Sequence, residues 1–258
     1  MILTNDNYFS KEADLEYMSV SQFKSFETCS AAAMAELRRE YDRETTTSLL
    51  VGSYVDARFD GTLDVFRINH PEMYKRDGSL KAEYIQAEQI INRIECDTLF
   101  MKYMSGEKQV IMTGNIAGIK VKIKIDSLLP DKIVDMKIMK DFAPVFVEGQ
   151  GRLPWFEAWR YDLQGAIYQE IVRQNTGKKL PFYLAAATKE KIPDIGIFLI
   201  EDDLLEYELS QFKTNAPVYD AMKKGILEPE RCEHCNYCKA TKVLTNENIV
   251  KSGDLINE

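Results

Sequence analysis

The sequence predicts a mixed α/β fold in which helices flank a central sheet. Three observations lead to this prediction. Apolar residues recur at helical spacing in the first hundred residues, at every second residue between Lys108 and Ile138, and again at helical spacing from residue 155, where short apolar runs follow. The 258 residues can bury a substantial core, and no low-complexity linker divides them. We therefore expect one domain over residues 1–258.

The N-terminal part, residues 1–105, is predicted to be helical. Ser19 or Ser21 is a plausible N-cap for the first helix, and a loop rich in charge, proline and glycine is expected at 69–79. The expected helices are Ser19–Glu40, Ser48–Phe59 and Lys81–Tyr103.

The middle part, residues 106–202, is predicted to form the sheet and one helix, at 155–174. Glycines and Pro130-Asp131 separate the first three strands. The expected strands are Lys108–Met112, Ile119–Leu128, Lys132–Ile138, Phe182–Ala187 and Ile195–Ile200. The C-terminal part, residues 203–258, should hold a helix at Asp203–Lys223 and then a cysteine-rich segment.

Composition limits the classes of function. The formal charge of −8 argues against a broadly basic surface that coats DNA, although a local basic channel is compatible with an acidic exterior. No run of about 18 apolar residues occurs, and the N-terminus lacks the apolar core of a signal peptide. We expect a cytoplasmic protein without a membrane segment.

Two acids and a lysine stand on neighbouring predicted strands. Asp126 precedes Asp135 by nine residues, and Lys137 follows on the same strand face as Asp135. Carboxylates at this separation suit Mg²⁺ or Mn²⁺ in phosphodiester hydrolysis, with Lys137 as a charge-stabilising group and the Met136 carbonyl as a further ligand. The alternative is that these residues are solvated strand charges, because Asp-x-Lys is a common tripeptide.

The runs GEKQVIMTGNIAGIKVKIKIDSLLPDKIVDMKIMKDF and YDLQGAIYQEIV resemble PD-(D/E)xK nucleases of the RecB-like branch, near phage and mobile-element proteins of the exonuclease VIII type. The resemblance covers nearly the whole chain. It implies a restriction-endonuclease-like αβββαβ core with N-terminal helices and a C-terminal cysteine-rich segment. It also implies a Mg²⁺- or Mn²⁺-dependent DNA exonuclease that resects linear duplex ends for a phage-type single-strand annealing protein.

The same resemblance implies a closed homo-oligomeric ring and, for a phage-encoded protein, the bacterial host cytoplasm. Two alternatives stay open. One is a catalytically idle nuclease fold that binds DNA ends or a partner. The other is a nuclease that trims single-stranded ends.

Three further site positions follow from the family pattern. Gln164 and Tyr168 match its Gln-x-x-x-Tyr helix motif and would share one helix face. Asp56 stands where relatives carry a metal-binding histidine after a glycine, here Gly52, and aspartate is also a hard ligand. Glu107 resembles a frequently acidic position and is a weaker candidate. Neither His70 nor His234 replaces the missing histidine.

Three of the five cysteines, Cys232, Cys235 and Cys238, form a C-x2-C-x2-C segment. Such a cluster in a cytoplasmic protein is more typical of a metal site than of disulfides. Cys29 resembles the first-helix cysteine of iron–sulfur members of the family, which implies a [4Fe–4S] cluster on these four residues. The spacing departs from the family's C-x2-C-x5-C, so zinc, with Cys29 or His234 as fourth ligand, and reduced thiols stay open. Cys96 is expected to be a core thiol.

Basic and aromatic residues near the acids are candidate DNA contacts. The alternatives are solvated strand lysines and core aromatic residues at helical spacing. The candidates are Lys120, Lys122, Lys124, Lys140 and Arg160 beside Tyr161, with Trp155, Phe156 and Trp159.

Overall fold

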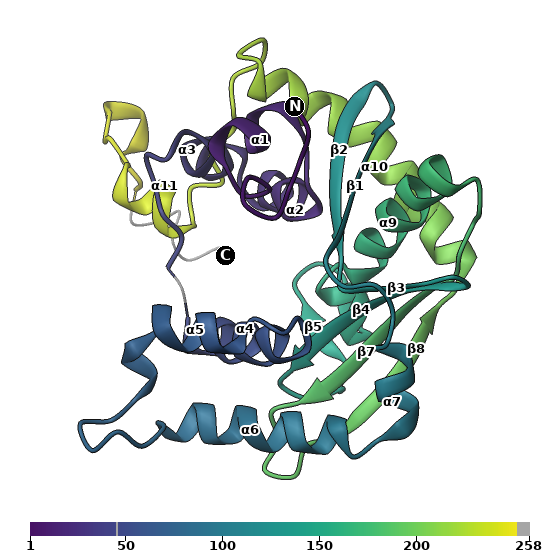
Figure 1. Ribbon diagram of the computed structural model, residues 1–258. Coiled ribbons are helices and arrows are strands. Elements are labelled where there is room, and N and C mark those ends of the chain that lie inside the picture. Colours follow the sequence, from purple (N-terminus) through teal and green to yellow (C-terminus); the bar gives the residue numbers. More distant parts are fainter. Residues whose placement is uncertain (45, 252–258) are drawn as a thin grey trace.

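A four-stranded mixed sheet lies at the centre of the molecule (Figure 1). The structure is a computed structural model that describes residues 1–44 and 46–251; residues 252–258, the end of the predicted C-terminal part, lie outside this range. Strand β4 is parallel to β7, and β3 and β8 pair antiparallel with them at the two sides. The order is β3 (Ser127–Leu129), β4 (Lys132–Met139), β7 (Phe182–Thr188) and β8 (Ile195–Ile200).

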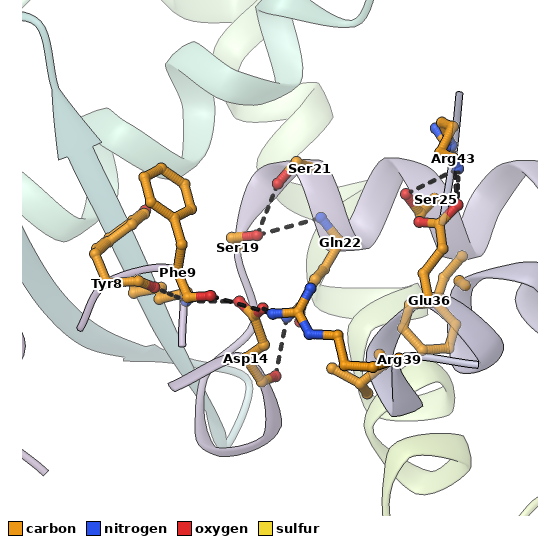
Figure 2. A pocket seen from close by; sticks show the side chains of 14 residues that line it. Tyr8, Phe9, Asp14, Ser19, Ser21, Gln22, Ser25, Glu36, Arg39 and Arg43 are labelled. Carbon is orange, nitrogen blue, oxygen red and sulfur yellow. Dashed lines mark hydrogen bonds and ion pairs between the residues drawn. The ribbon is translucent and has the colours of Figure 1, made fainter. Parts of the chain in front are cut away.

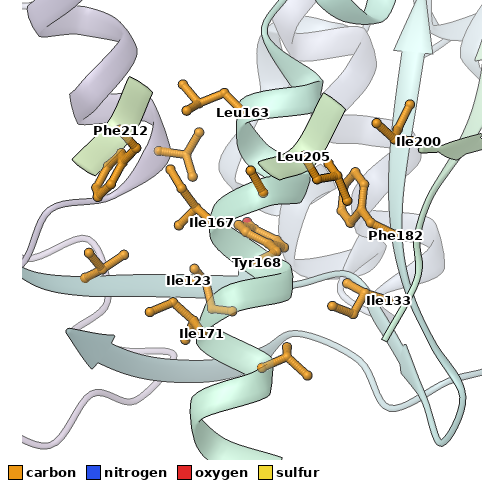
Figure 3. Close-up of a cluster of buried hydrophobic side chains, with 14 of the residues drawn as sticks. Ile123, Ile133, Leu163, Ile167, Tyr168, Ile171, Phe182, Ile200, Leu205 and Phe212 are labelled. Atoms are coloured by element: carbon orange, nitrogen blue, oxygen red, sulfur yellow. The ribbon is translucent and has the colours of Figure 1, made fainter. Parts of the chain in front are cut away.

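Helix α9 (Tyr161–Thr176) makes the crossover between the parallel strands β4 and β7 and packs on one face of the sheet. Figure 3 shows this core, where Ile133 and Phe182 of the strands meet Ile167 and Ile171 of α9. Gly165 permits the close approach, because a Cβ there would overlap the Phe182 ring. The crossover helix is thus held tightly against the sheet.

The other face of the sheet is covered by α4 (Thr47–Phe59) and α6 (Ala82–Glu95). Alternate strand residues decide the faces: Val134 and Met136 point into this second core, and Ile133 points into the first. Helices on both faces of a mixed sheet confirm the predicted fold class.

A long hairpin, β1 (Val110–Ile116) with β2 (Ile119–Ile125), extends from the sheet toward the N-terminal helices (Figure 1). A single residue, Asp126, separates β2 from β3, so the predicted single strand Ile119–Leu128 is divided there. The N-terminal segment pairs with the hairpin, where Met18 forms a parallel bridge to Val121. The N-terminal segment therefore covers part of β2.

Three of the predicted helices are broken, each at a residue whose backbone leaves the helical region. Cys29 is extended (φ −165°) and divides 19–40. Asp97 is extended and caps the next helix by accepting from the Phe100 amide at 2.8 Å, which divides 81–103. Arg160 is left-handed (φ 56°) and divides 155–174. The resulting helices are α2 (Val20–Thr28), α3 (Ser30–Arg38), α6, α7 (Thr98–Tyr103), α8 (Trp155–Ala158) and α9.

Several short elements were not expected from the sequence. They include α1 (Lys11–Glu16), α5 (Leu63–Asn69), the hairpin β5 (Val145–Val147) with β6 (Gly151–Leu153), and the turns η1 (Pro71–Met73) and η2 (Asn246–Asn248). The C-terminal part forms α10 (Asp202–Lys223) and the short α11 (Asn236–Ala240). Within the described residues, no helix combines the length and apolarity needed to cross a bilayer.

Candidate active site

Two carboxylates lie close together where the β1–β2 hairpin connects to the central sheet. Asp126 stands between β2 and β3, and its Oδ2 accepts a 2.9 Å hydrogen bond from the Met136 amide of β4. Strand β3 pairs with β4 only as far as Val134, so the Met136 amide is free for this bond. The division of the predicted strand at Asp126 thus brings its carboxylate beside Asp135.

Asp135 is almost fully buried, at 2% exposure, and lies on the face of β4 that meets α9. Gln164 of α9 donates from Nε2 to Asp135 Oδ1 at 2.5 Å. Lys137, two residues along the same strand, forms an ion pair with Asp135 Oδ2. Among the described residues that oxygen has no hydrogen-bond partner of good geometry. Asp135 therefore presents a buried oxygen with capacity to bind a further positive group.

Asp56 of α4 lines the same cavity as Lys137, which has a volume of 660 Å³. Asp60 stands one helical turn later, at the end of α4. The side-chain amide nitrogen of Gln109 connects Asp60 with Asp126, because it donates to Asp60 Oδ1 at 2.9 Å and to Asp126 Oδ1 at 3.4 Å. The helix thus brings acids to the same place as the sheet.

We call Asp56, Asp126 and Asp135 the carboxylate group. Burial, and then the charge of Asp135, raise the pKa of Asp126 to about 7. Burial, and then the charge of Asp126, raise the pKa of Asp56 well above its usual range. Burial alone would lower the pKa of Lys137, but the charges of Asp135, Tyr161 and Asp126 together outweigh it and raise that pKa. Acids that repel one another in a desolvated place are a ready site for a cation.

Tyr168 is buried in the core between α9 and the sheet. Its hydroxyl donates to the Lys124 carbonyl of β2 at 2.9 Å. With Gln164 and Asp126 it lines a second cavity, of 280 Å³. Tyr168 therefore braces the helix against the hairpin, while Gln164, one turn earlier, contacts the acids.

Lys24 of α2 enters this region from the N-terminal helices. Its ammonium donates to the Trp159 carbonyl at 2.8 Å and lies 4.9 Å from the centre of the Tyr161 ring. Lys137 lies 4.8 Å from the same ring centre. Burial, and then the charge of Lys137, lower the pKa of Lys24 to about 7. The site thus contains two neighbouring lysines, and a bound anion would stabilise the positive charge of both.

The proposed DNA-contacting residues have different environments. Lys122 is buried at 1% exposure and pairs with Asp14 at 2.8 Å, because the N-terminal segment covers β2. Arg160 is held by Glu208 at 2.7 Å and by Glu27 at 3.4 Å. The expectation of a DNA contact is therefore wrong for Lys122, whose ammonium is enclosed.

The remaining candidates divide into exposed and buried residues. Lys140 is almost fully exposed, and Lys120 is exposed but paired with Glu16. Lys124 lies 5.5 Å from the centre of the Phe9 ring and lines the cavity beside Asp126. Of the aromatic residues, Trp155 belongs to the core, Phe156 is partly buried against it, and Trp159 is half exposed at the 660 Å³ cavity.

A further cavity, of 320 Å³, lies between the N-terminal segment and α2 and α3 (Figure 2). Its arginines already have partners: Arg39 pairs with Asp14 at 3.1 Å, and Arg43 pairs with Glu36 at 2.9 Å. The positive charge of this cavity is therefore balanced by protein acids, whereas the Lys24 ammonium donates to a backbone carbonyl.

The four predicted cysteine ligands come together. The sulfurs of Cys29, Cys232, Cys235 and Cys238 all lie within 4.8 Å of one another, and we call these residues the cysteine group. His234 is not among the residues that the geometry groups there. Cys96 is exposed at the end of α6, so its assignment as a core thiol is wrong.

Two other predicted candidates make no side-chain contact with the carboxylate group among the described residues. Glu107 is exposed, and its backbone pairs with Leu128. His70 binds Glu72 at 2.7 Å on the surface. Sequence reasoning missed Asp60, Gln109 and Lys24 at the site. Asp60 has a signal, its i+4 spacing from Asp56, whereas Lys24 and Gln109 reach the site only through tertiary packing.

Comparison with known proteins agrees with this geometry. Residues 19–241 match the model of a family described as a PDDEXK-like domain of unknown function (DUF3799). Among solved structures, the chain is similar to the crystal structure of a "Putative exonuclease" from Eubacterium rectale. The two share 47% sequence identity and a TM-score of 0.94, over 100% of this chain and 99% of that one. A search of curated proteins finds no match. Because the family model spans most of its length, this chain belongs to the PDDEXK-like family DUF3799.

Proposed function

We propose that the protein is a divalent-metal-dependent DNA exonuclease. The observation that carries the proposal is the convergence of Asp126, Asp135 and Lys137 with Asp56 in one desolvated place. The proposal also draws on membership of a PDDEXK-like family and on similarity to a protein described as a "Putative exonuclease".

The residues present fit Mg²⁺ or Mn²⁺. The donors are carboxylate oxygens, which these hard cations prefer, and Asp135 Oδ2 is buried without a well-placed hydrogen-bond partner among the described residues. We propose Asp56, Asp126 and Asp135 as ligands, with the Met136 carbonyl as a further one. A divalent cation bound there would lower the pKa of the attacking water and offset charge on the phosphate.

The other residues position the acids and balance charge. Gln164 fixes the orientation of Asp135 through its 2.5 Å hydrogen bond. Lys137 brings a positive charge beside Asp135, where it would stabilise negative charge that develops on a scissile phosphate. Tyr168 holds α9 to β2 and so maintains the place of Gln164. Lys24 lies against the same Tyr161 ring as Lys137, where a bound phosphate would favour its charged form.

The family resemblance extends this proposal to a biological role. The enzyme would resect the ends of linear duplex DNA and supply single strands to an annealing protein, acting as a homo-oligomer that encloses DNA. These partners rest on the resemblance alone.

Digestion of end-labelled linear duplex tests the activity. We expect degradation with Mg²⁺ or Mn²⁺, none in chelator, and none of a covalently closed circle of the same sequence. Cleavage of the circle would contradict the exonuclease assignment. Binding of DNA ends without cleavage under any metal would instead support an idle nuclease fold, and exclusive digestion of single strands would support an end-trimming nuclease.

A further inference from the structure

The cysteine group joins two distant parts of the chain. Cys29 lies at the break between α2 and α3, whereas Cys232, Cys235 and Cys238 precede or enter α11. The Cys29 and Cys238 sulfurs are 3.6 Å apart although 209 residues separate them. The Cys232 and Cys238 sulfurs are 3.9 Å apart.

The backbone around these residues is arranged for thiolates. The Cys235 amide donates to Cys232 Sγ at 3.3 Å, and the Cys238 amide donates to Cys235 Sγ at 3.4 Å. Bonds of this kind orient metal ligands and stabilise their negative charge. None of the four residues forms a disulfide, so their convergence calls for another cause.

A second set of bonds holds the two segments together beside the sulfurs. The Ala31 amide donates to the Glu230 carbonyl at 2.9 Å, and the Glu230 amide donates to Ser30 Oγ at 2.9 Å. Cys29 and Cys238 are buried. The separation of the sulfurs is therefore defined by the packed backbone on both sides.

The sulfur separations discriminate between one metal ion and a cluster. Four sulfurs around one zinc ion, each bonded at about 2.3 Å, lie about 3.8 Å apart along the edges of a tetrahedron. In a [4Fe–4S] cluster each cysteine binds a different corner iron, so the sulfurs stand roughly 6 Å apart. The observed 3.6 and 3.9 Å, with all pairs within 4.8 Å, do not fit the cluster that the family resemblance implies.

We propose that the cysteine group binds a single tetrahedral zinc ion. Four thiolates are a ligand set typical of structural zinc, and they leave no coordination position for water or substrate. The site therefore has no part in the cleavage chemistry. It fastens the α2–α3 junction to the C-terminal segment, closing a loop of about two hundred residues.

Metal analysis of the full-length protein tests the proposal. The protein is purified without oxygen from cells supplied with both iron and zinc, and its zinc, iron and acid-labile sulfide are measured. We expect about one zinc per chain, no sulfide and no visible absorption, with no change on exposure to air. Iron with sulfide would overturn the proposal, as would iron alone or a metal-free protein.

A pair of variants assigns the metal to these residues. Cys235→Ser should lower the zinc content at least about tenfold, whereas Cys96→Ser, which removes an exposed cysteine outside the group, should leave it unchanged. Retention of zinc by Cys235→Ser would overturn the assignment.

Because Cys235→Ser can fail to fold, native Cys96→Ser protein is also titrated with an organomercurial thiol reagent. Zinc release that rises in step with reaction of the four remaining thiols supports the site. Full reaction of the thiols before any zinc appears overturns it.

Discussion

The carboxylate group and the cysteine group are both clusters of potential ligands, but they are built in different ways. The carboxylates come from α4, the β2–β3 junction and β4, elements that the two cores hold in place. The cysteines come from a helix break and a C-terminal segment with few core contacts of their own. The two cores hold the carboxylates in position, whereas the proposed zinc ion would hold the two cysteine segments together.

This difference implies opposite contributions to stability. Partly buried acids with raised pKa values repel one another, which would weaken the folded state in the absence of a cation. Four thiolates on one ion would add the free energy of metal binding to folding. Changes in the two groups should therefore have opposite effects on stability and separate effects on activity.

The largest expected effect is on cleavage. Asp135→Asn keeps the shape of the side chain but removes its charge, and should reduce cleavage of linear duplex by about 10³-fold or more. The zinc content should not fall. Asp131→Asn, at the exposed turn between β3 and β4, is the matched control and should keep full activity. Wild-type cleavage by Asp135→Asn would contradict the role of the carboxylate group.

Removal of a cysteine ligand should act mainly on stability. Cys238→Ser should lower the thermal unfolding midpoint by about 10 °C, since a structural metal contributes several kcal/mol and each one shifts a chain of this size by a few degrees. Differential scanning fluorimetry measures the midpoint, with Cys96→Ser as control. Equal midpoints for the two variants would refute the proposed difference between the groups.

Asp56 tests whether the helix completes the carboxylate group. Asp56→Ala should reduce cleavage about tenfold to a hundredfold and raise the Mg²⁺ concentration needed for half-maximal activity. Asp56→His should recover part of that loss, because the family resemblance implies a metal-binding histidine at this position. If Asp56→Ala has an unchanged metal requirement, Asp56 is not a ligand.

The smallest effect is a gain in stability. Asp126 has its pKa raised from 3.8 to about 7, so the folded state keeps a proton that the unfolded chain releases between these values. The contribution of this proton to the stability of the folded state is therefore complete below pH 3.8 and is lost as the pH rises through 7.

In chelator, Asp126→Asn should therefore unfold about 1–3 °C above the wild type at pH 8, with no gain at pH 4. Thermal unfolding at the two pH values measures this. If the variant's unfolding midpoint rose more at pH 4 than at pH 8, the pH dependence would be opposite to the expected one and would contradict the proposed repulsion.

The sequence predicted the sheet better than the helices. A period of two in residues 119–138 placed Asp135 and Lys137 on one face of β4, and their ion pair agrees with that placement. Helical periodicity, in contrast, continues through Cys29, where Phe26 and Met34 pack in one small cluster, and through Arg160, where both sides pack on the main core. Only tertiary contacts decide where such helices break.

Local sequence patterns could not predict which residues surround the acids of the site. Lys122 has the alternation of an exposed strand residue, yet Met18 and the N-terminal segment cover it. Lys24 and Gln109 come from elements that no spacing connects with Asp126. Pairings of residues far apart in the chain leave no periodic signal, so a single sequence shows the acids without their neighbours.

The hydrogen bond from the Met136 amide to Asp126 also completes the hydrogen bonding of β4. On the side of β3, within the described residues, no strand pairs with β4 beyond Val134, although Met136 is buried. A buried amide without a partner costs free energy, and the Asp126 carboxylate supplies that partner. The replacement of Asp126 by an apolar residue would therefore remove a proposed ligand and also leave a buried backbone amide unpaired.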